Sequence, residues 1–392
     1  PNRPSSLRLG VNNHYIQQER NKWLIRFGKE KVFKQTEIDN AVYEPLAVTR
    51  LEAPKLAPHL SYKLKKLMHH KTLRTFLKTN VQMTAEKLVY DYVKSLSSLQ
   101  IQNAAVIVIE NSTQNVITYI GSADFRNKTD GGQVNGAAAI RQPGSALKPF
   151  IYGLCIDNGL LTPKTVIADV ETDFGGYVPE NYDNKFRGNV TAEFALENSL
   201  NIPAVKALQQ LGSEIFIAKL KQCDFRQVGK DEKKLGLSLA LGGCGVTLEE
   251  MGGLYASLAN KGTYKPIRFV QQNSIHNKIQ SASNPDSVNV LSKEAAFMIT
   301  EILSKIARPD LPVNWESSSH LPRIAWKTGT SYGKRDAWSI GYNKKYTVAV
   351  WVGNFSGIGV PELNGANIAT PLLFKIFNTI DYNSQNEWYE IP

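Results

Sequence analysis

No stretch of this sequence is apolar enough to cross a membrane, since about 18 consecutive apolar residues are needed and no such run occurs. The first residues, PNRP, lack the charged, apolar and small-residue regions of a signal peptide. The three cysteines form no C-x-x-C pair and are odd in number, and the six histidines show no H-E-x-x-H spacing. We therefore predict no disulfide framework, no metal and no cofactor.

The composition is that of a globular protein. Of the 392 residues, 42% are hydrophobic and 21% are charged, which is enough to bury a sizeable core. The length predicts two or three structural units. Because the first residue is proline rather than methionine, we expect a processed chain or a fragment of a longer protein.

The charge is strongly positive and unevenly placed. The net charge is +11, and basic residues crowd into the first 75 positions, as at 63–66 and 69–71. Nucleic-acid binding is one interpretation of such an excess. No stacking motif with interleaved aromatic residues accompanies it, so we predict no nucleic-acid partner. A solvated face, or a surface near anionic lipid or an anionic wall polymer, fits better.

Helical patterns come first along the chain. Residues 15–27 carry apolar positions at helical spacing, and residues 35–42 form a second short helical segment. Prolines at 45, 54 and 58 then mark a connector. Residues 84–96 are again helical, with Thr84 as the expected N-cap.

Strand patterns flank a mostly helical middle region at 145–305. They occur at residues 104–109, 116–120, 323–330, 336–342 and 346–353. The first two form a hairpin, and the last three form a meander. Strands from two distant segments most simply join into one sheet. We therefore predict an α+β fold with a five-stranded antiparallel sheet, flanking helices and a helical subdomain.

Three short motifs occur in order: S-x-x-K at 145–148, S-x-N at 199–201 and K-T-G at 327–329. Each is weak alone, since a second S-x-x-K begins at Ser331 and further S-x-N matches begin at Ser287 and Ser384. K-T-G occurs once. Their order and their structural settings carry the argument.

Ser145 and Lys148 are the predicted nucleophile and base. A serine hydroxyl needs a base to take its proton, and residues three apart at the start of a helix share one face. Burial and a second cation, for which we expect Lys327, would lower the pKa of Lys148. Gly144 lets the chain turn sharply into the helix, and the free backbone N–H groups at the start of a helix can face an oxyanion. The alternative is a helix cap beside a surface charge.

The other two motifs can bind a substrate. Ser199 and Asn201 are expected in a loop at 199–203, where a hydroxyl and an amide can relay a proton and hold a peptide carbonyl. Lys327 and Gly329 share one face of a strand, with Thr328 and Thr330 on the other. We expect Gly329 to let a substrate backbone approach, and the lysine and threonines to bind a carboxylate. The alternative for Ser199 and Asn201 is an ordinary helix end. The alternative for K-T-G is an exposed edge strand on which Lys and Gly prevent pairing with another chain.

This trio resembles that of serine β-lactamases and penicillin-binding proteins. The flanking segments resemble class A penicillin-binding proteins: GGQVNG at 131–136, RQPGSALKPF at 141–150, DFGGY at 173–177 and PENYD at 179–183. LALGGCGVT at 239–247 is similar to the 1C group of that family. The resemblance covers about residues 100–380, and it implies the penicillin-binding/serine β-lactamase-like transpeptidase fold.

The resemblance also implies a role for each matching residue. Ser145 would be acylated by the penultimate D-alanine of a stem peptide ending in D-Ala-D-Ala, with Lys148 as base. Ser199 and Asn201 would assist proton transfer and orientation. The carboxylate pocket would be lined by Lys327, Thr328, Gly329 and Thr330. The backbone N–H groups of Ser145 and Thr330 would form the oxyanion hole, and β-lactams would stay bound to Ser145.

The family further implies how the chain divides. We expect the C-terminal remnant of a glycosyltransferase domain at 1–50, a linker region at 51–100, the transpeptidase domain at 101–380 and the start of a C-terminal extension at 381–392. The fragment is expected to be soluble, without glycan polymerisation. Its parent is expected to be bifunctional and anchored at the periplasmic, extracytoplasmic face of a bacterial inner membrane. Expected partners are peptidoglycan stem peptides, β-lactam antibiotics and other cell-wall synthesis proteins.

Three other functions compete with D,D-transpeptidation. A D,D-carboxypeptidase differs in that water rather than an amine takes the acyl group, which the sequence does not decide. A catalytically weak wall-binding or scaffold module would keep the motifs without productive acylation. A β-lactamase needs a carboxylate that positions water for deacylation. Glu180 and Glu193 are its candidates, but their sequence context matches the penicillin-binding loop.

Overall fold

A computed structural model of the protein describes residues 6–7, 10–46, 56–67, 72–271, 287–308, 323–382 and 387–392. The chain divides into two compact units, Pro1–Lys55 and Leu56–Pro392. Among the described residues, no helix combines the length and the apolar composition that a membrane crossing requires.

The first unit contains two helices, α1 (Asn13–Lys29) and α2 (Gln35–Tyr43), which pack against each other. Ile38 of α2 is buried, while no residue of α1 is. These helices confirm the two segments predicted at 15–27 and 35–42.

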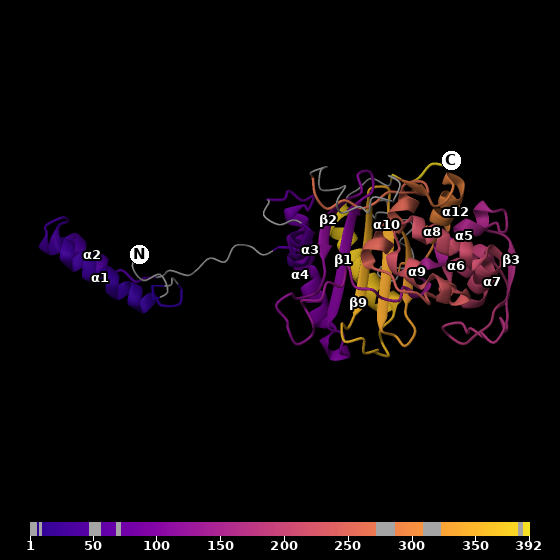
Figure 1. Ribbon diagram of the computed structural model, residues 1–392, viewed down its shortest axis with the longest axis horizontal. Coiled ribbons are helices and arrows are strands. Elements are labelled where there is room, and N and C mark those ends of the chain that lie inside the picture. The colour runs from indigo at the N-terminus through magenta and orange to yellow at the C-terminus, as the bar shows by residue number, and fades with distance from the viewer. Residues whose placement is uncertain are drawn as a thin grey trace. The chain divides into compact units, whose positions relative to one another are not determined.

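The second unit combines one large sheet with helices on both of its faces (Figure 1). Its helices are α3 (Pro58–Leu67), α4 (Thr79–Ser95), α5 (Lys148–Asp157), α6 (Ala192–Glu197), α7 (Asn201–Leu211), α8 (Ser213–Gln222), α9 (Arg226–Asp231), α10 (Leu248–Ala259), α12 (Lys293–Ser304) and α13 (Thr370–Asp381). Its strands are β1 (Asn103–Glu110), β2 (Asn115–Ile120), β3 (Val166–Asp169), β4 (Gly188–Thr191), β5 (Thr263–Tyr264), β6 (Val288–Asn289), β7 (Ala325–Thr330), β8 (Asp336–Tyr342) and β9 (Tyr346–Gly353).

The large sheet is antiparallel, with the strand order β2-β1-β9-β8-β7. This confirms the predicted sheet of five strands from two distant segments and the α+β class. Strands β3 and β4 form a separate pair within the region 145–305 that was predicted to be mostly helical, and β5 pairs with β6. Strand β7 is therefore an edge of the large sheet.

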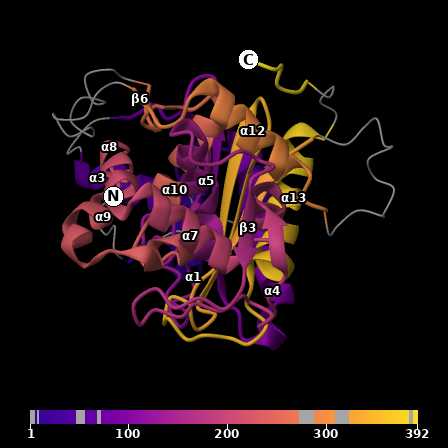
Figure 2. The same ribbon diagram turned by 90° about the vertical axis from the view of Figure 1, so that its right-hand side faces the viewer.

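Two hydrophobic cores lie on the two faces of the sheet, because alternate residues of each strand point in opposite directions. Ile107 of β1 packs in the core that contains α5, α10 and α12, whereas its neighbour Val106 packs in the core that contains α4 and α13. Figure 2 shows these two groups of helices on opposite sides of the sheet. Burial on both faces explains why β1 is a nearly continuous apolar run.

Two expectations fail in the segment before the sheet. Helix α4 begins at Thr79 rather than at Thr84, whose hydroxyl instead donates to the Asn80 carbonyl inside the helix. Residues 56–100, expected to be part of a linker, belong to the second unit, where α3 and α4 pack against β2. The apolar face of α4, with Ala85 and Val89 fully buried, accounts for this packing.

Candidate active site

Ser145 lies in a tight turn that leads into α5. Residues Gly144–Leu147 form one turn of 3-10 helix, and α5 begins directly after it. Gly144 has a φ of 57°, the left-handed region that favours glycine. A Cβ atom on residue 144 would lie 2.3 Å from the Thr330 carbonyl oxygen and 2.7 Å from the Thr330 nitrogen. Glycine here therefore lets the Ser145 turn press against the end of β7.

The same turn fills the space beside Gly329. A Cβ atom on residue 329 would lie 2.0 Å from the carbonyl oxygen of Pro143 and 3.2 Å from Cβ of Ala146. We expected Gly329 to leave room for a substrate backbone, but protein occupies that side of the strand. The physical reason for glycine is the close packing of the nucleophile turn on β7.

Lys148 is the first residue of α5, and its side chain is fully buried. Its Nζ donates to the carbonyl oxygens of Ser199 (2.7 Å) and Leu200 (3.0 Å) and to Oδ1 of Asn201 (2.7 Å). Burial, and next the positive charge of Lys327, hold the pKa of Lys148 well below its usual value, while the charge of Asp169 opposes them. The prediction that Lys327 is the second cation is supported by this direction.

Lys327 reaches the same place from β7. Its Nζ donates to the hydroxyl of Ser199 at 2.7 Å and to the carbonyl of Thr328 at 3.1 Å. Its side chain is 1% exposed, and burial lowers the pKa of Lys327 to about 7. Near neutral pH this amine therefore exists in both charge states, and an arriving carboxylate would favour the charged one.

Ser199 joins the two lysines, its carbonyl accepting from Lys148 and its hydroxyl from Lys327. Its φ is 55°, which is uncommon for a residue other than glycine. This left-handed conformation follows the end of helix α6. The backbone N–H of Leu200 donates a hydrogen bond to the Ala195 carbonyl at 2.9 Å. Such backbone outliers concentrate at functional sites.

Asn201 begins helix α7 rather than lying in the loop expected at 199–203. The backbone N–H of Asn201 donates to Oδ1 of Asn181 at 2.7 Å, and its side-chain Nδ2 donates to the Glu180 carbonyl at 2.6 Å. Asn181 Nδ2 in turn lies 2.9 Å from both carboxylate oxygens of Asp169, which is fully buried. A chain of hydrogen bonds thus runs from Asp169 through Asn181 and Asn201 to Lys148.

Sequence reasoning missed the parts that Asp169 and Asn181 play. Asn181 lies in the PENYD segment at 179–183, whose resemblance to the family gave the available signal. Asp169, at the end of β3, had no such signal, because a single Asp at the end of a short strand is ordinary in sequence.

Replacing Asn181 by alanine should slow acylation of the protein by a penicillin and lower its stability by about 1–3 kcal/mol, because the buried Asp169 carboxylate and the Asn201 amide lose a partner. Stopped-flow labelling and urea unfolding measure the two effects. Asn189→Ala, at an exposed position of the neighbouring strand β4, is the control and should change stability by no more than about 0.5 kcal/mol. Equal behaviour of the two variants would contradict the role of Asn181.

The K-T-G strand borders the site as an edge strand. Thr328 and Thr330 are partly exposed, as the predicted alternation requires, whereas Lys327 and Gly329 are buried. The Thr330 hydroxyl accepts a hydrogen bond from the Gly365 amide at 3.0 Å and keeps its own proton to donate. The Thr330 hydroxyl therefore remains able to donate to an anion.

Ser145 itself is half-buried, and in the described part of the chain its hydroxyl is hydrogen-bonded to neither lysine amine. Side chains three apart are close neighbours where a 3-10 turn continues into an α-helix, as it does from Ser145 to Lys148. In unliganded enzymes such hydrogen bonds are often long and tighten when the substrate binds.

The second S-x-x-K motif has a different setting. Ser331 lies in the turn between β7 and β8, where its Oγ accepts from the amides of Arg335 (3.3 Å) and Asp336 (2.9 Å). Lys334 reaches the carbonyl of Pro361 at 2.7 Å. This motif shapes a hairpin turn, and it contributes no buried amine.

A family model described as the penicillin-binding protein transpeptidase domain matches residues 104–376, which is more than half of the chain. The chain belongs to this family. The match spans the transpeptidase sheet from β1 to most of α13, together with all three motifs. The family expected from the motifs and flanking segments is thereby confirmed.

Two known penicillin-binding proteins are similar in sequence to this chain. Penicillin-binding protein 1C of Escherichia coli is 33% identical over 389 residues, covering 98% of this chain and 48% of that protein. Penicillin-binding protein 1F of Bacillus subtilis is 30% identical over 292 residues, covering 72% of this chain and 39% of that protein. The chain thus spans less than half of the length of each of these relatives.

Solved structures share the fold. Penicillin-binding protein 1A from Haemophilus influenzae has a TM-score of 0.75 at 18% identity, covering 100% of this chain and 80% of that one. PonA1 from Mycobacterium tuberculosis, solved in complex with penicillin V, has a TM-score of 0.68 at 20% identity and covers 85% of this chain and 94% of that one.

Proposed function

We propose that this transpeptidase domain is a serine D,D-transpeptidase that cross-links peptidoglycan stem peptides through an acyl-enzyme on Ser145. The observation that supports this most is the meeting of two buried lysines at Ser199, one on its carbonyl and one on its hydroxyl. Lys148, a lysine with a depressed pKa three residues along the chain from the partly buried Ser145, would provide the base that the reaction needs.

In the proposed acylation, Lys148 takes the hydroxyl proton as Ser145 Oγ bonds to the carbonyl carbon of the penultimate D-alanine. The backbone N–H groups of Ser145 and Thr330 would hold the resulting oxyanion. The C–N bond then breaks, and the terminal D-alanine leaves with a proton relayed through the Ser199 hydroxyl. Asn201 would orient the donor peptide, and Lys327 would hold its terminal carboxylate together with Thr328 and Thr330.

In the second half-reaction, an amine of a second stem peptide attacks the ester carbonyl and gives up a proton, and Ser145 recovers its hydroxyl. A β-lactam would follow the first half only, because its leaving group stays attached. The two carboxylates weighed for a β-lactamase do not favour that reading. Glu193 pairs with Lys164 and lies 3.8 Å from Lys305, and Glu180 is exposed.

We also propose that the domain works within a longer membrane-anchored protein at the outer face of the inner membrane. Residues 1–50 would be the end of a glycosyltransferase domain, 101–380 the transpeptidase domain and 381–392 the start of a C-terminal extension. Two observations support a longer protein with a further domain: the relatives are about twice as long as this chain, and the two helices of residues 1–55 form a separate unit.

Release of D-alanine from a synthetic stem pentapeptide ending in D-Ala-D-Ala tests the function. We expect release from the free acid, and release at least about 30-fold slower from the same peptide with an amidated C-terminus, because the buried Lys327 loses its charge partner. With an amine acceptor present, a cross-linked product would distinguish transpeptidation from carboxypeptidation. Equal rates for the two peptides, or no release from either, would contradict the proposal.

A further inference from the structure

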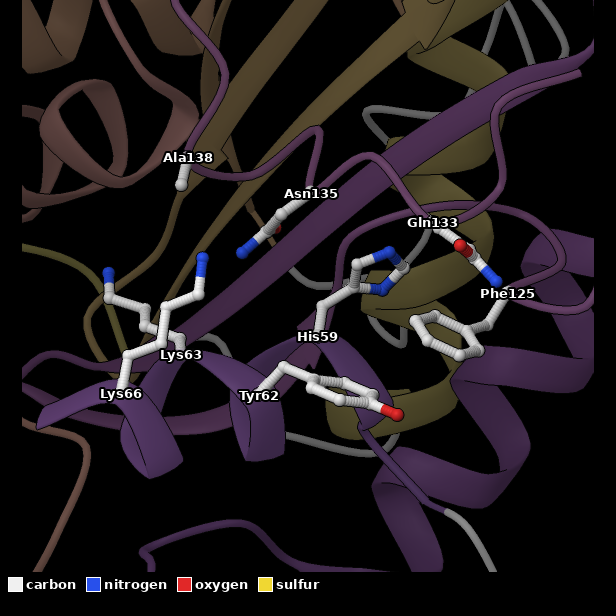
Figure 3. A pocket seen from close by; sticks show the side chains of 8 residues that line it. All are labelled: His59, Tyr62, Lys63, Lys66, Phe125, Gln133, Asn135 and Ala138. Atoms are coloured by element: carbon white, nitrogen blue, oxygen red, sulfur yellow. The ribbon is translucent and has the colours of Figure 1, made fainter. Parts of the chain in front are cut away.

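Two cavities lie outside the candidate active site. One has a volume of about 660 Å³ and lies beside α3, where side chains of α3 and of residues 125–138 line it (Figure 3). Nothing in the described part of the chain shows what this cavity binds. The other has a volume of about 80 Å³ and lies between α10, α12 and the last residues of the sequence. Here the chain itself supplies the occupant, residues 387–392, which we call the 387–392 segment.

Trp388 is the first anchor of the 387–392 segment. Its indole Nε1 donates a hydrogen bond to one carboxylate oxygen of Glu301 on α12. The guanidinium group of Arg323 lies over the indole ring, 4.2 Å from the ring centroid, and donates to the other oxygen of Glu301 at 3.1 Å. Tryptophan is the aromatic side chain that attracts a cation most strongly. The three side chains therefore form a closed set of contacts between the segment, α12 and the residues before β7.

Tyr389 is the second anchor, at the turn between β8 and β9. Its hydroxyl donates to the Asn343 carbonyl at 2.9 Å, and Glu387 lies 3.6 Å from Lys344 of the same turn. Both Trp388 and Tyr389 pack against the hydrophobic core that contains α5, α10 and α12. Figures 1 and 2 both place the end of the chain beside α12. The segment thus joins α12, the start of β7 and the β8–β9 turn.

This attachment is weaker than the packing of the core. The side chains of Arg323 and Glu301 are 40% and 31% exposed, so that water competes for their contacts. A cavity remains between the segment and Phe297 of α12, and Ile391 is 83% exposed. Segments with few buried apolar contacts open at low free energy while the rest of the domain stays folded. The 387–392 segment can therefore detach by itself.

The helix under the segment supports all three motifs of the active site. Helix α12 packs against α5, which begins with Lys148, and against α6, which ends two residues before Ser199. It also packs against β7, which contains Lys327. A contact that holds α12 in place therefore bears on the elements that carry the nucleophile turn and both lysines.

The start of β7 is tied directly to the end of α12. Arg323 donates to Oγ of Ser304 at 2.9 Å, and Nε1 of Trp326 donates to the Ile306 carbonyl at 3.3 Å. Arg323 lies two residues before β7 and four before Lys327. Any contact that fixes Arg323 therefore also restrains the backbone that leads to Lys327.

We propose that the 387–392 segment is a detachable strap that docks on α12 and positions Lys327 in the active site. When the strap is docked, Trp388 holds Arg323 against Glu301 and fixes the start of β7. When it is detached, Arg323 keeps only its bonds to α12, and the start of β7 can move. Trp388 is thus a positioning residue that acts through Arg323. The proposal rests on the proposed function in so far as Lys327 binds the donor carboxylate.

Replacing Trp388 by alanine in the full chain tests the strap. We expect the backbone amides of residues 323–330 to exchange hydrogen faster, and acylation of Ser145 by a penicillin to slow by about 3- to 30-fold, as coupling between linked sites commonly gives. Tyr382→Ala removes an exposed aromatic side chain outside the strap and should change neither quantity. Hydrogen-exchange mass spectrometry and stopped-flow labelling measure the two effects, and a melting curve shows that each variant is folded.

Two further measurements separate positioning from a general loss of stability. The peptide EWYEIP, added at about 1 mM, should restore slow exchange and fast acylation to Trp388→Ala, whereas the same peptide with its tryptophan replaced by alanine should not. Trp388→Ala should also release D-alanine more slowly from the free-acid stem pentapeptide, with little change for the amidated one. The reason is that only the free acid depends on where Lys327 lies.

Four results would overturn the proposal. Exchange at residues 323–330 that stays as in the parent chain, or that EWYEIP does not reverse, would contradict docking of the strap. Unchanged acylation, or equal slowing for the two pentapeptides, would contradict the positioning of Lys327. If the parent chain is not acylated at all, the proposed function fails. Exchange at residues 323–330 then still decides whether the strap docks.

Discussion

Replacing Ser145 by alanine should abolish covalent labelling by a fluorescent penicillin and leave the folded protein intact. The change removes the single atom that would form the acyl bond. Ser145 is half-buried, and its hydroxyl has no bond to either lysine that would be lost. We therefore expect stability within about 0.5 kcal/mol of the parent, which is a shift in melting temperature of no more than a few degrees.

The second S-x-x-K motif provides the matched control for this variant. Ser331→Ala should be labelled like the parent chain. Its stability should fall by about 1–3 kcal/mol, because the buried amide of Asp336 loses its acceptor. Ser145→Ala should thus lose labelling and keep its stability, whereas Ser331→Ala should keep labelling and lose stability. Labelling that survives in Ser145→Ala would show that the nucleophile is misassigned.

Replacing Lys148 by alanine should slow acylation by about 10²–10⁴-fold, the range that general bases contribute. The truncation also leaves the Ser199 and Leu200 carbonyls without their donor. A melting curve is therefore needed to show that the variant is folded. Lys334→Ala, in the second motif, is the control and should be acylated at the parent rate. A folded Lys148→Ala chain that reacts at the parent rate would contradict the assigned role.

The pH dependence of acylation gives a second test of Lys148 that does not depend on a truncation. A base must be neutral, so the rate at saturating β-lactam should rise with pH as Lys148 loses its proton. Because burial and the charge of Lys327 depress the pKa of Lys148, this rise should be complete well below pH 10.5. Lys327→Gln removes the neighbouring positive charge and should move the rise to higher pH. A profile that does not move would contradict the coupling.

Local sequence patterns predicted the elements of this fold well where a pattern has one structural meaning. The apolar run of β1 and the alternation in β7 each led to the right strand, and the turn residues between β1 and β2 led to the hairpin. The start of α4 was missed because Thr84 followed by apolar residues at helical spacing looks like a cap even in the middle of a helix.

The site was harder to predict because it depends on contacts between distant segments. That Lys148 and Lys327 meet at Ser199 follows from no local pattern. We expected Lys327 as the second cation because a lysine base needs a lowered pKa, but the sequence did not indicate that Ser199 would join the two lysines. Asp169 stayed unseen because its role depends on Asn181 and on burial, neither of which a single residue reveals. The space beside Gly329 was assigned to the substrate because sequence alone does not show which neighbour requires a glycine.

The central claim is that the hydroxyl of Ser145 is made reactive toward acyl donors by its own turn, by the segment around Ser199 and by strand β7. Intact-mass spectrometry of the 392-residue chain after incubation with a penicillin, followed by peptide mapping, tests it most directly. We predict a single adduct of the mass of the penicillin on the peptide that contains Ser145. A protein without an adduct, or with the adduct on another residue, would contradict the account.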